Sequence, residues 1–242
     1  MVGARPETPR VRTLVLEVPY WPGHRAGQHL DLRLTAEDGY QAQRSYSIAS
    51  APGESRVEVT VERLSDGEVS PYLTDVIQEG DLLDVRGPIG GYFVWVPEPA
   101  RPLALVGGGS GVVPLMCMLR YRASLTADSP AAVPPARLLY SARSDEERIY
   151  GAELDRLAAT DPDLRVAYTL TRSQPAAWRG YHRRLDREML EEVFWRAAAA
   201  PVFYVCGPTT LVEAAATLLV ELGHQPADVR TERFGPTGGA GP

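Results

Sequence analysis

Four glycines around a single serine, set between two apolar segments, constrain this chain more than any other feature. Residues 103–106 predict a buried strand, residues 107–111 a tight turn, and residues from Val112 onward a helix with Pro114 in its first turn. Glycines let the backbone approach an anion, and the free N–H groups at a helix N-terminus favour negative charge. The unit predicts a site for a dinucleotide pyrophosphate. A plain strand-to-helix turn is the alternative, because Pro114 stands where the usual fingerprint has a third glycine.

Charge and cysteine count exclude several classes of protein. A formal net charge of -6 argues against nucleic acid as a partner, because phosphate-backbone binding needs a basic surface. Two cysteines cannot supply a disulfide framework or four thiolate ligands, and the histidines show no metal-ligand spacing. There is no run of 18 apolar residues and no signal-peptide core. We expect a cytoplasmic protein with no metal site, no membrane contact and no nucleic-acid partner.

The first half of the chain predicts an antiparallel β-barrel or sandwich. Short runs rich in β-branched and aromatic residues are separated by Gly, Pro or Asp. One helical patch, residues 69–77, follows Gly67 and is a second candidate anion site. Residues 97–102 break all periodicity, so we place a domain boundary there, between residues 98 and 99. The expected strands are residues 11–18, 28–34, 44–48, 56–62, 82–86 and 92–96.

One of these strands alternates a cation, an aromatic ring and hydroxyl groups. Strand geometry puts Arg44, Tyr46 and Ile48 on one face, and Ser45 and Ser47 on the other. An arginine holds phosphate, a tyrosine stacks on a flat heterocycle and a serine hydrogen-bonds a ring nitrogen. The strand therefore suits a flavin nucleotide. The alternative is an ordinary barrel strand with an exposed arginine and a tyrosine at its rim.

The second half alternates strands with helices. This order predicts a parallel sheet covered by helices, with ligands at the carboxyl ends of the strands. The expected strands are residues 103–106, 137–141, 164–170, 202–205 and 229–234, and the expected helices are residues 113–125, 151–159, 186–196 and 211–222.

Three arginines follow strands of this half on the side where ligands are expected. Arg143, Arg172 and Arg184 suit the 2′-phosphate of a nucleotide, because an ionised phosphate takes charge-assisted and often bidentate hydrogen bonds. The alternative is surface ion pairs with acids in the same loops, namely Asp145, Glu146 and Asp186.

Taken in order, these motifs resemble those of the ferredoxin-NADP reductase superfamily in its compact bacterial form, over about residues 11–234. The segment from Arg44 to Ser47 is similar to the family's flavin motif. That likeness implies that Arg44 contacts the FAD pyrophosphate, Tyr46 stacks on the isoalloxazine and Ser47 lies near N5. The turn formed by Gly67, Glu68, Val69 and Ser70 is similar to the one that receives the pyrophosphate.

The second half carries the nucleotide motifs of the same family. Gly109-Ser110-Gly111-x-x-Pro114 resembles the family's nucleotide turn, and Cys206-Gly207-Pro208 resembles the motif that sets a cysteine beside the nicotinamide. Glu232-x-Phe234 resembles the family's end, in which an aromatic residue covers the flavin, although eight residues follow it here.

The resemblance implies two domains, a Greek-key β-barrel that binds FAD (residues 1–98) and an α/β domain that binds NAD(P) (residues 99–242). The implied activity is hydride transfer from NADPH or NADH to FAD, with electrons passed singly to a separate ferredoxin or haem protein. We expect a monomer that favours NADPH. A flavin reductase that releases its flavin and a non-catalytic nucleotide-binding subunit are the alternatives.

The predicted site residues fall into two groups. Ser47, Cys206 and Phe234 are expected to flank the reacting atoms. The residues expected to bind cofactor are Arg44, Tyr46, Ser47, Thr60, Glu62, Gly67, Glu68, Val69, Ser70, Gly109, Ser110, Gly111, Pro114, Arg143, Arg172, Arg184, Cys206, Gly207, Pro208 and Phe234.

Overall fold

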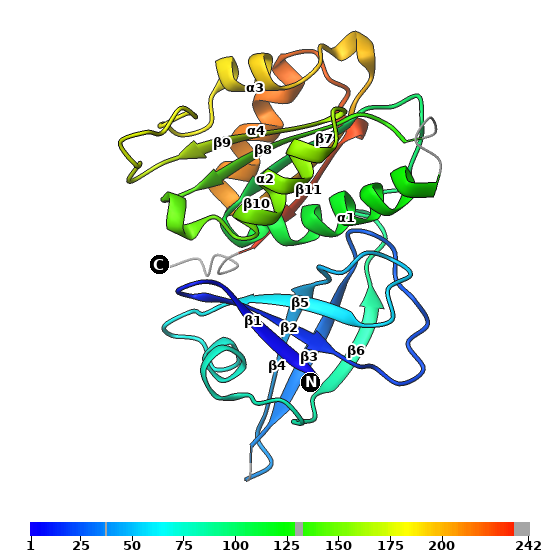
Figure 1. Ribbon diagram of the computed structural model, residues 1–242, viewed down its shortest axis with the longest axis vertical. Coiled ribbons are helices and arrows are strands. Elements are labelled where there is room, and N and C mark those ends of the chain that lie inside the picture. The colour runs from blue at the N-terminus through cyan, green and yellow to red at the C-terminus, as the bar shows by residue number, and fades with distance from the viewer. Residues whose placement is uncertain (37, 129–132, 235–242) are drawn as a thin grey trace, which may run out of the picture.

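The computed structural model describes residues 1–36, 38–128 and 133–234. The chain forms an antiparallel β part and an α/β part, which lie one below the other in Figure 1. The strands of the β part are β1 (Gly3–Thr8), β2 (Val11–Leu16), β3 (His29–Thr35), β4 (Gln41–Ser47), β5 (Val57–Glu62) and β6 (Asp84–Ile89).

These six strands form a Greek-key barrel. They are arranged in two antiparallel sheets, in the orders β1-β2-β5 and β4-β3-β6, and a bridge between Ile48 and Val59 joins the two. β5 therefore lies between β2 and β4, which is the strand order of a Greek key. Leu14, Leu30 and Leu32 are fully buried in the core that both sheets enclose.

Three elements of the barrel differ from the prediction. β1 was missed, because it contains Pro6; a proline is tolerated there since β1 pairs with β2 alone, at a sheet edge. The predicted strand at residues 92–96 is wrong: Phe93, Val94 and Trp95 are buried in succession between the two parts, without strand alternation. The helix expected at residues 69–77 is a single π-helical turn, η1 (Tyr72–Val76).

The α/β part has the predicted alternation of strands and helices. Its sheet is parallel throughout, and its strands are β7 (Leu103–Gly108), β8 (Ala136–Ala142), β9 (Leu164–Leu170), β10 (Val202–Gly207) and β11 (Val229–Arg233), in the order β11-β10-β7-β8-β9. The helices are α1 (Val112–Asp128), α2 (Gly151–Thr160), α3 (Arg187–Val193) and α4 (Thr209–Glu221), with 3-10 turns η2 (Gly109–Gly111), η4 (Asp145–Glu147), η5 (Ala197–Ala199) and η6 (Pro226–Asp228).

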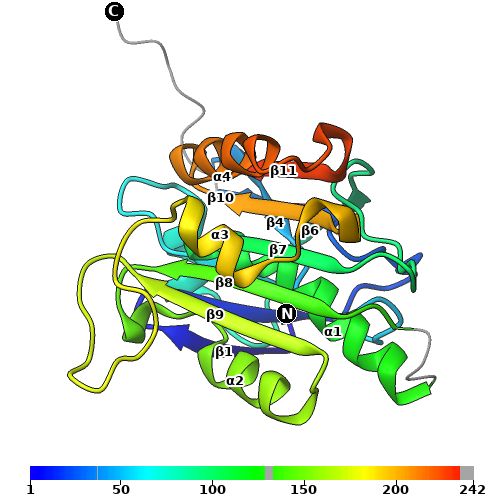
Figure 2. The same ribbon diagram turned by 90° about the horizontal axis from the view of Figure 1, so that it is seen from above.

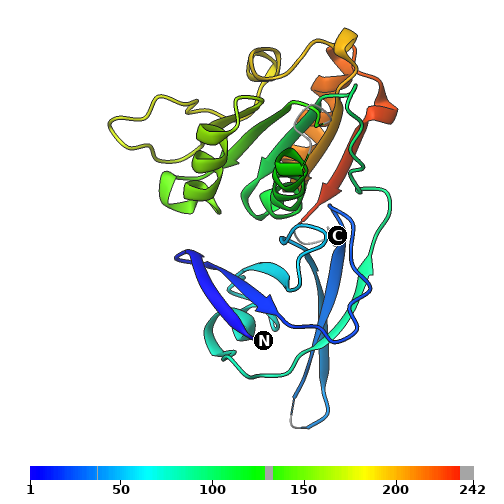
Figure 3. The ribbon, with the colours of Figure 1, turned by 45° about the vertical axis from the view of Figure 1, so that its right-hand side comes forward.

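The helices cover both faces of this sheet. α3 and α4 pack on one face, and α1 and α2 pack on the other, which is the face turned toward the barrel (Figures 2 and 3). The core beneath α1 does not stop at the sheet. Ala49 and Phe93 of the barrel side belong to the same buried cluster as Val113 and Cys206. An apolar interface continuous with the core under α1 therefore joins the two parts, while the barrel's own core around Leu14 and Leu30 is a separate cluster.

The predicted boundary between residues 98 and 99 falls in the segment that joins β6 to β7. We keep that division of the chain as a proposal. Over residues 1–36, 38–128 and 133–234, no helix combines the length and the apolar character needed to cross a lipid bilayer.

Candidate functional site

The glycine turn at the end of β7 packs backbone against backbone on the end of β10. A Cβ on Gly111 would lie 2.2 Å from the Cys206 carbonyl oxygen and 2.6 Å from the Gly207 Cα, so no larger residue fits. Gly109 has a φ of +54°, and nothing lies within 4 Å of the position its Cβ would take. Ser110 is half-buried between them, and Pro114 is buried in the first turn of α1. The turn thus presents an open backbone surface, as an anion site requires.

The same turn faces the barrel. η2 contacts β5, and α1 runs on from η2 along the side of the α/β part that faces the barrel (Figure 1). The nucleotide turn therefore lies against β5, which is bridged to the end of the predicted flavin strand β4 through Val59 and Ile48, although more than 60 residues separate the turn from β4 in sequence.

The end of β10 brings the predicted nicotinamide-side residues together. Cys206 is fully buried, and burial, followed by the nearby Glu232 carboxylate, raises the pKa of its thiol well above the ordinary value. A Cβ on Gly207 would lie 3.0 Å from the Gly108 carbonyl oxygen, which keeps the two turns in contact. The backbone N–H of half-buried Phe234 donates to the Gly207 carbonyl oxygen at 3.0 Å. Phe234 therefore reaches the site, and residues 235–242 lie outside the described part of the chain.

Glu232 is a candidate site residue to which the sequence interpretation gave no role. It pairs in register with Cys206 across β10 and β11, and burial raises the pKa of its carboxyl to about 7. Its Oε2 atom is the one buried side-chain oxygen or nitrogen without a hydrogen-bond partner in the described ranges. A buried polar atom without a partner is costly, so this oxygen is suited to a ligand or water. The signal in the sequence was a carboxylate two residues before Phe234, the last aromatic residue of the chain.

The flavin strand β4 has the predicted alternation. Tyr46 pairs with Leu30 and packs on the barrel core, and burial raises the pKa of its phenol to about 12. Ser47 is buried on the opposite face. Arg44 is exposed, donates to the Gln43 carbonyl oxygen at 2.7 Å, and its Nη2 lies 3.7 Å from a Glu68 carboxylate oxygen. This long ion pair leaves the guanidinium open to a phosphate.

The turn before η1 lies beside that arginine. Glu68 faces Arg44 and also accepts a hydrogen bond from the Tyr40 hydroxyl at 3.1 Å. The Ser70 hydroxyl is buried, accepts from the Leu64 N–H at 3.0 Å and would lie 2.9 Å from a Cβ on Gly67. The Val69 side chain is in the barrel core. The Ser70 hydroxyl is therefore used in a hydrogen bond within its own loop. If this turn binds pyrophosphate, it does so through its backbone N–H groups.

Thr60 and Glu62 lie on β5, but they are placed differently. Thr60 is buried, and its hydroxyl contacts those of Thr13 and Tyr150 where the two parts meet. Glu62 is half-buried on the same strand. A cofactor-binding role for either residue stays a prediction, and for Thr60 the structure records another use of the hydroxyl.

The predicted phosphate arginines lie in neighbouring loops. The Arg172 N–H donates to the Arg143 carbonyl oxygen at 2.9 Å, which holds the loops after β8 and β9 together. The backbone of the adjacent Arg183 meets the Thr169 hydroxyl at the end of β9, so Arg184 belongs to the same edge. All three predicted arginines are exposed.

Two of the three acids that were the alternative partners of these arginines are paired elsewhere, and the third, Glu146, is exposed. Asp145 accepts from Arg148 at 2.7 Å, and Asp186 accepts from Arg183. In the described ranges, no ion pair joins Arg143, Arg172 or Arg184 to a carboxylate. Their guanidinium groups are therefore open to a ligand anion.

The residues present fit a flavin and a nicotinamide dinucleotide. The open face of Gly109, the orphaned Glu232 oxygen and the exposed Arg44 supply a backbone cradle, a buried polar contact and a cation. Gly109 follows β7 and Glu232 lies near the end of β11, whereas Arg44 lies in the middle of β4.

Comparison with known proteins agrees with this fit. Residues 9–94 match the oxidoreductase FAD-binding domain family, and residues 105–217 match the oxidoreductase NAD-binding domain family. The chain therefore consists of an FAD-binding region followed by an NAD-binding region.

Individual relatives cover most of this chain. A ferredoxin-NADP reductase B of Sorangium cellulosum is 35% identical over 97% of this chain and 96% of its own length. A glycine betaine monooxygenase reductase subunit of Chromohalobacter salexigens is 32% identical over 88% of this chain and 56% of its own length. This chain thus spans little more than half the length of that relative, as it does for several others. The flavohem-like FAD/NAD-binding domain of a Vibrio cholerae nitric oxide dioxygenase shares the fold, with a TM-score of 0.82, 24% identity, and 97% and 96% of the two chains covered.

Proposed function

Because the chain belongs to the ferredoxin-NADP reductase superfamily of FAD- and NAD(P)-binding oxidoreductases, we propose that it oxidises NAD(P)H and passes electrons singly to a separate iron-sulfur or haem protein. Bound FAD would supply the redox chemistry, since a flavin accepts a hydride and releases electrons one at a time. The observation that carries the proposal is the contact of the glycine turn with both β10 and β5. That contact sets the nucleotide turn beside the barrel.

In this proposal the chain's residues position two cofactors rather than transfer protons. Arg44 and the backbone of the turn at residues 67–70 hold the FAD pyrophosphate, and Tyr46 and Phe234 lie against the flavin. Ser47 and Cys206 flank the reacting atoms from the barrel side and the sheet side. Hydride transfer between two bound rings needs orientation above all, and orientation alone is worth several orders of magnitude in rate.

We propose that NADPH is favoured over NADH. The support is the pair of joined loops that carry Arg143 and Arg172, with Arg184 at the same edge, and the engagement of Asp145 and Asp186 by other arginines. Glu146 and Glu147 remain exposed in the first of these loops, and they oppose the preference.

The names of the relatives support an acceptor that is a separate protein. The Chromohalobacter relative is the reductase subunit of a monooxygenase, and a Burkholderia cepacia relative is the electron transfer component of a dioxygenase. We propose that this chain works as a monomer in the cytoplasm beside such an oxygenase or its ferredoxin.

The test is retention of flavin combined with turnover. A yellow protein that keeps FAD through gel filtration and reduces a dye or a ferredoxin with NADPH or NADH supports the proposal. A colourless protein that reduces added free flavin would instead be a flavin reductase. A protein that binds nucleotide and reduces neither would be a non-catalytic subunit of a larger complex.

A further inference from the structure

A buried tyrosine of the α/β part reaches into the barrel. Tyr150 is 3% exposed, immediately precedes α2, and adopts a left-handed backbone with a φ of +58°. Its hydroxyl meets the Thr60 hydroxyl on β5, which lies 2.7 Å from the Thr13 hydroxyl on β2. Thr13 in turn donates to Glu7 on β1 at 2.7 Å. One phenol from the upper part thus enters a hydrogen-bonded chain that crosses three barrel strands.

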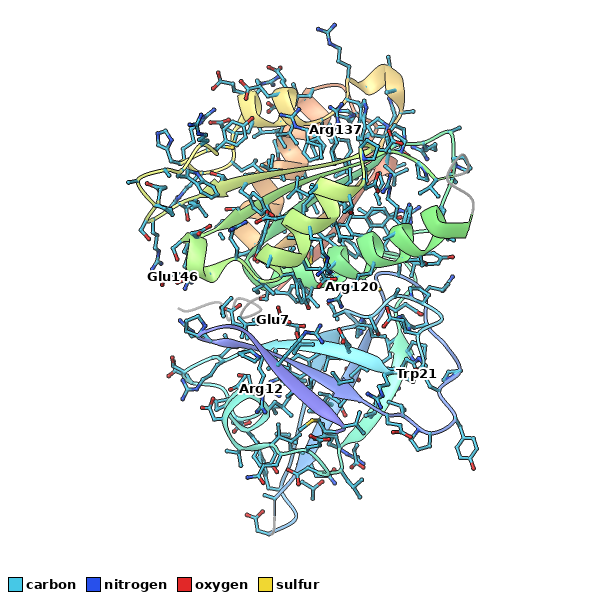
Figure 4. All side chains as sticks on the ribbon, in the orientation of Figure 1. Glu7, Arg12, Trp21, Arg120, Arg137 and Glu146 are labelled. Atoms are coloured by element: carbon cyan, nitrogen blue, oxygen red, sulfur yellow. The ribbon has the colours of Figure 1, made fainter. Side chains whose placement is uncertain are left out.

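Arg120 of α1 stands over the same tyrosine and binds both parts. Its guanidinium lies 5.1 Å from the Tyr150 ring centroid. It donates to Glu153 of α2 at 2.7 and 2.8 Å, to Glu58 of β5 at 2.8 Å, and to the Ala49 carbonyl oxygen at 2.9 Å. Figure 4 shows Arg120 at the lower edge of the α/β part, facing the barrel above Glu7. Its side chain is only 12% exposed, so these bonds are largely shielded from water.

These contacts hold the elements that carry the candidate site. α1 begins directly after the glycine turn, and Arg120 on it binds Ala49, two residues after Ser47. One turn earlier on α1, the Cys117 thiol donates to the Ser50 carbonyl oxygen at 3.0 Å. Thr60 follows Val59, which bridges to Ile48, the residue after Ser47. The nucleotide turn and the flavin strand are therefore tied to each other through Tyr150 and Arg120, at a distance from the reacting atoms.

We propose that Tyr150, with Arg120, is a positioning residue that sets the distance between the nucleotide turn and β4, and thereby the rate of hydride transfer. The kinetic part of this inference rests on the proposed function, and the structural part does not. A displacement of about 1 Å at a reacting centre can lower a rate about a hundredfold, so loss of one hydroxyl is expected to be visible.

The experiment compares Tyr150→Phe with Tyr168→Phe. Tyr168 is the matched control, because its hydroxyl donates at 2.6 Å to Asp155 within the α/β part. Spin labels on Ser65→Cys and Ala159→Cys, both exposed, report the distance between barrel and α2, and the two native cysteines are buried. We expect Tyr150→Phe to broaden the measured distance distribution in the protein with or without FAD, and Tyr168→Phe to leave it unchanged.

The kinetic readout uses stopped-flow reduction of bound flavin by NADPH. We expect Tyr150→Phe to lower the limiting rate about tenfold or more with the nucleotide KM within about twofold, since positioning and not binding is affected. Thr60→Val is expected to reproduce the defect, and the double variant is expected to be no slower than either single variant.

An unchanged distance distribution in Tyr150→Phe would overturn the proposal. If the wild-type protein reduces its flavin, a flavin-reduction rate in Tyr150→Phe equal to that of the wild type would also overturn it. A wild-type protein that does not reduce flavin would overturn the proposed function instead, while the distance measurement still decides whether Tyr150 holds the two parts.

Discussion

Cys206 on β10 lies directly beside Glu232 on β11, so a thiol and a carboxyl that are both removed from water share the edge of the sheet where the nucleotide turn ends. Burial raises the pKa of each group, and it raises that of Glu232 to about 7. Near neutral pH, the protonated and ionised forms of Glu232 are therefore both populated in the folded protein.

Glu232 should therefore make stability depend on pH. Its carboxyl binds its proton more tightly in the folded state, so this contribution is complete below the ordinary value of 4.5 and is lost as pH rises through about 7. Between pH 6 and pH 8 the free energy of unfolding should fall by about 1 kcal/mol from this group. Urea unfolding at the two pH values measures it, and Glu232→Gln should remove most of the difference. An equal fall in the variant would assign the effect to other groups.

Arg44→Ala should purify with much less FAD. The guanidinium is exposed and only loosely paired with Glu68, and loss of a charged contact to pyrophosphate should weaken binding at least about tenfold. The ratio of flavin to protein absorbance gives the result. Glu68→Gln is the matched control and should keep its FAD, because it removes the competing carboxylate. Normal FAD content in a folded Arg44→Ala protein would contradict the assignment.

Ser47→Ala and Cys206→Ala should each slow flavin reduction by about tenfold while leaving FAD content unchanged, since both residues are assigned to orientation of the reacting rings. Stopped-flow bleaching of the flavin band measures the rate directly. Rates equal to wild type in both variants would mean that these buried side chains serve packing alone.

Replacement of Arg143 and Arg172 by alanine should erase most of a preference for NADPH. A lost charged contact to phosphate costs a few kcal/mol, so the wild-type preference should be about tenfold or more. The KM for NADPH should rise while that for NADH stays constant. Arg187→Ala, which removes an arginine paired with Glu221 on the far face of the sheet, is the control. A wild-type specificity constant that is higher with NADH would show that the exposed arginines contact solvent and do not bind the 2′-phosphate.

Gly111→Ala should destabilise the fold far more than Gly109→Ala. The added methyl would lie 2.2 Å from the Cys206 carbonyl oxygen in the first case, and nothing lies within 4 Å in the second. The positive φ of Gly109 alone costs about 1–2 kcal/mol on replacement. Thermal unfolding of the two variants, with FAD content as a second readout, tests the contrast. Equal losses of stability would mean that the backbone around Gly111 and Cys206 moves apart to accommodate the added methyl group.

The regular elements were largely predictable, because their hydrophobic periods are local. The parallel sheet, its helices and five of the six barrel strands could be predicted because the pattern of apolar and polar residues within each short segment indicates its structure. Residues 92–96 were misassigned because an apolar run buried between two parts has the composition of a strand without its pairing. β1 was missed because Pro6 reads as a break, and only an edge position makes it acceptable.

Candidate site residues could be proposed from the sequence where a motif supplied the spacing, and not where the fold supplied the neighbour. Arg44, Ser47 and the glycine turn could be identified in the sequence, whereas Glu232 acquires its high pKa only from burial beside Cys206. Tyr150 carries no local signal at all, since its partner Thr60 lies 90 residues away. Long-range polar contacts of this kind depend on how two elements pack, which periodicity does not encode.

The apolar interface between barrel and sheet limits how this sequence could be recombined. A barrel grafted from a relative would bring new side chains at the positions of Ala26, Ala49 and Phe93, and these would have to match the volumes that α1 presents. Met118 reaches that surface, since its Cε would lie 2.8 Å from a Cβ on Gly27, and an unbranched thioether adapts to altered shapes better than branched side chains do. Chimeras that exchange the halves together with α1 should therefore tolerate divergence, whereas a cut that separates α1 from Ala49 would leave both fragments with a mismatched apolar face.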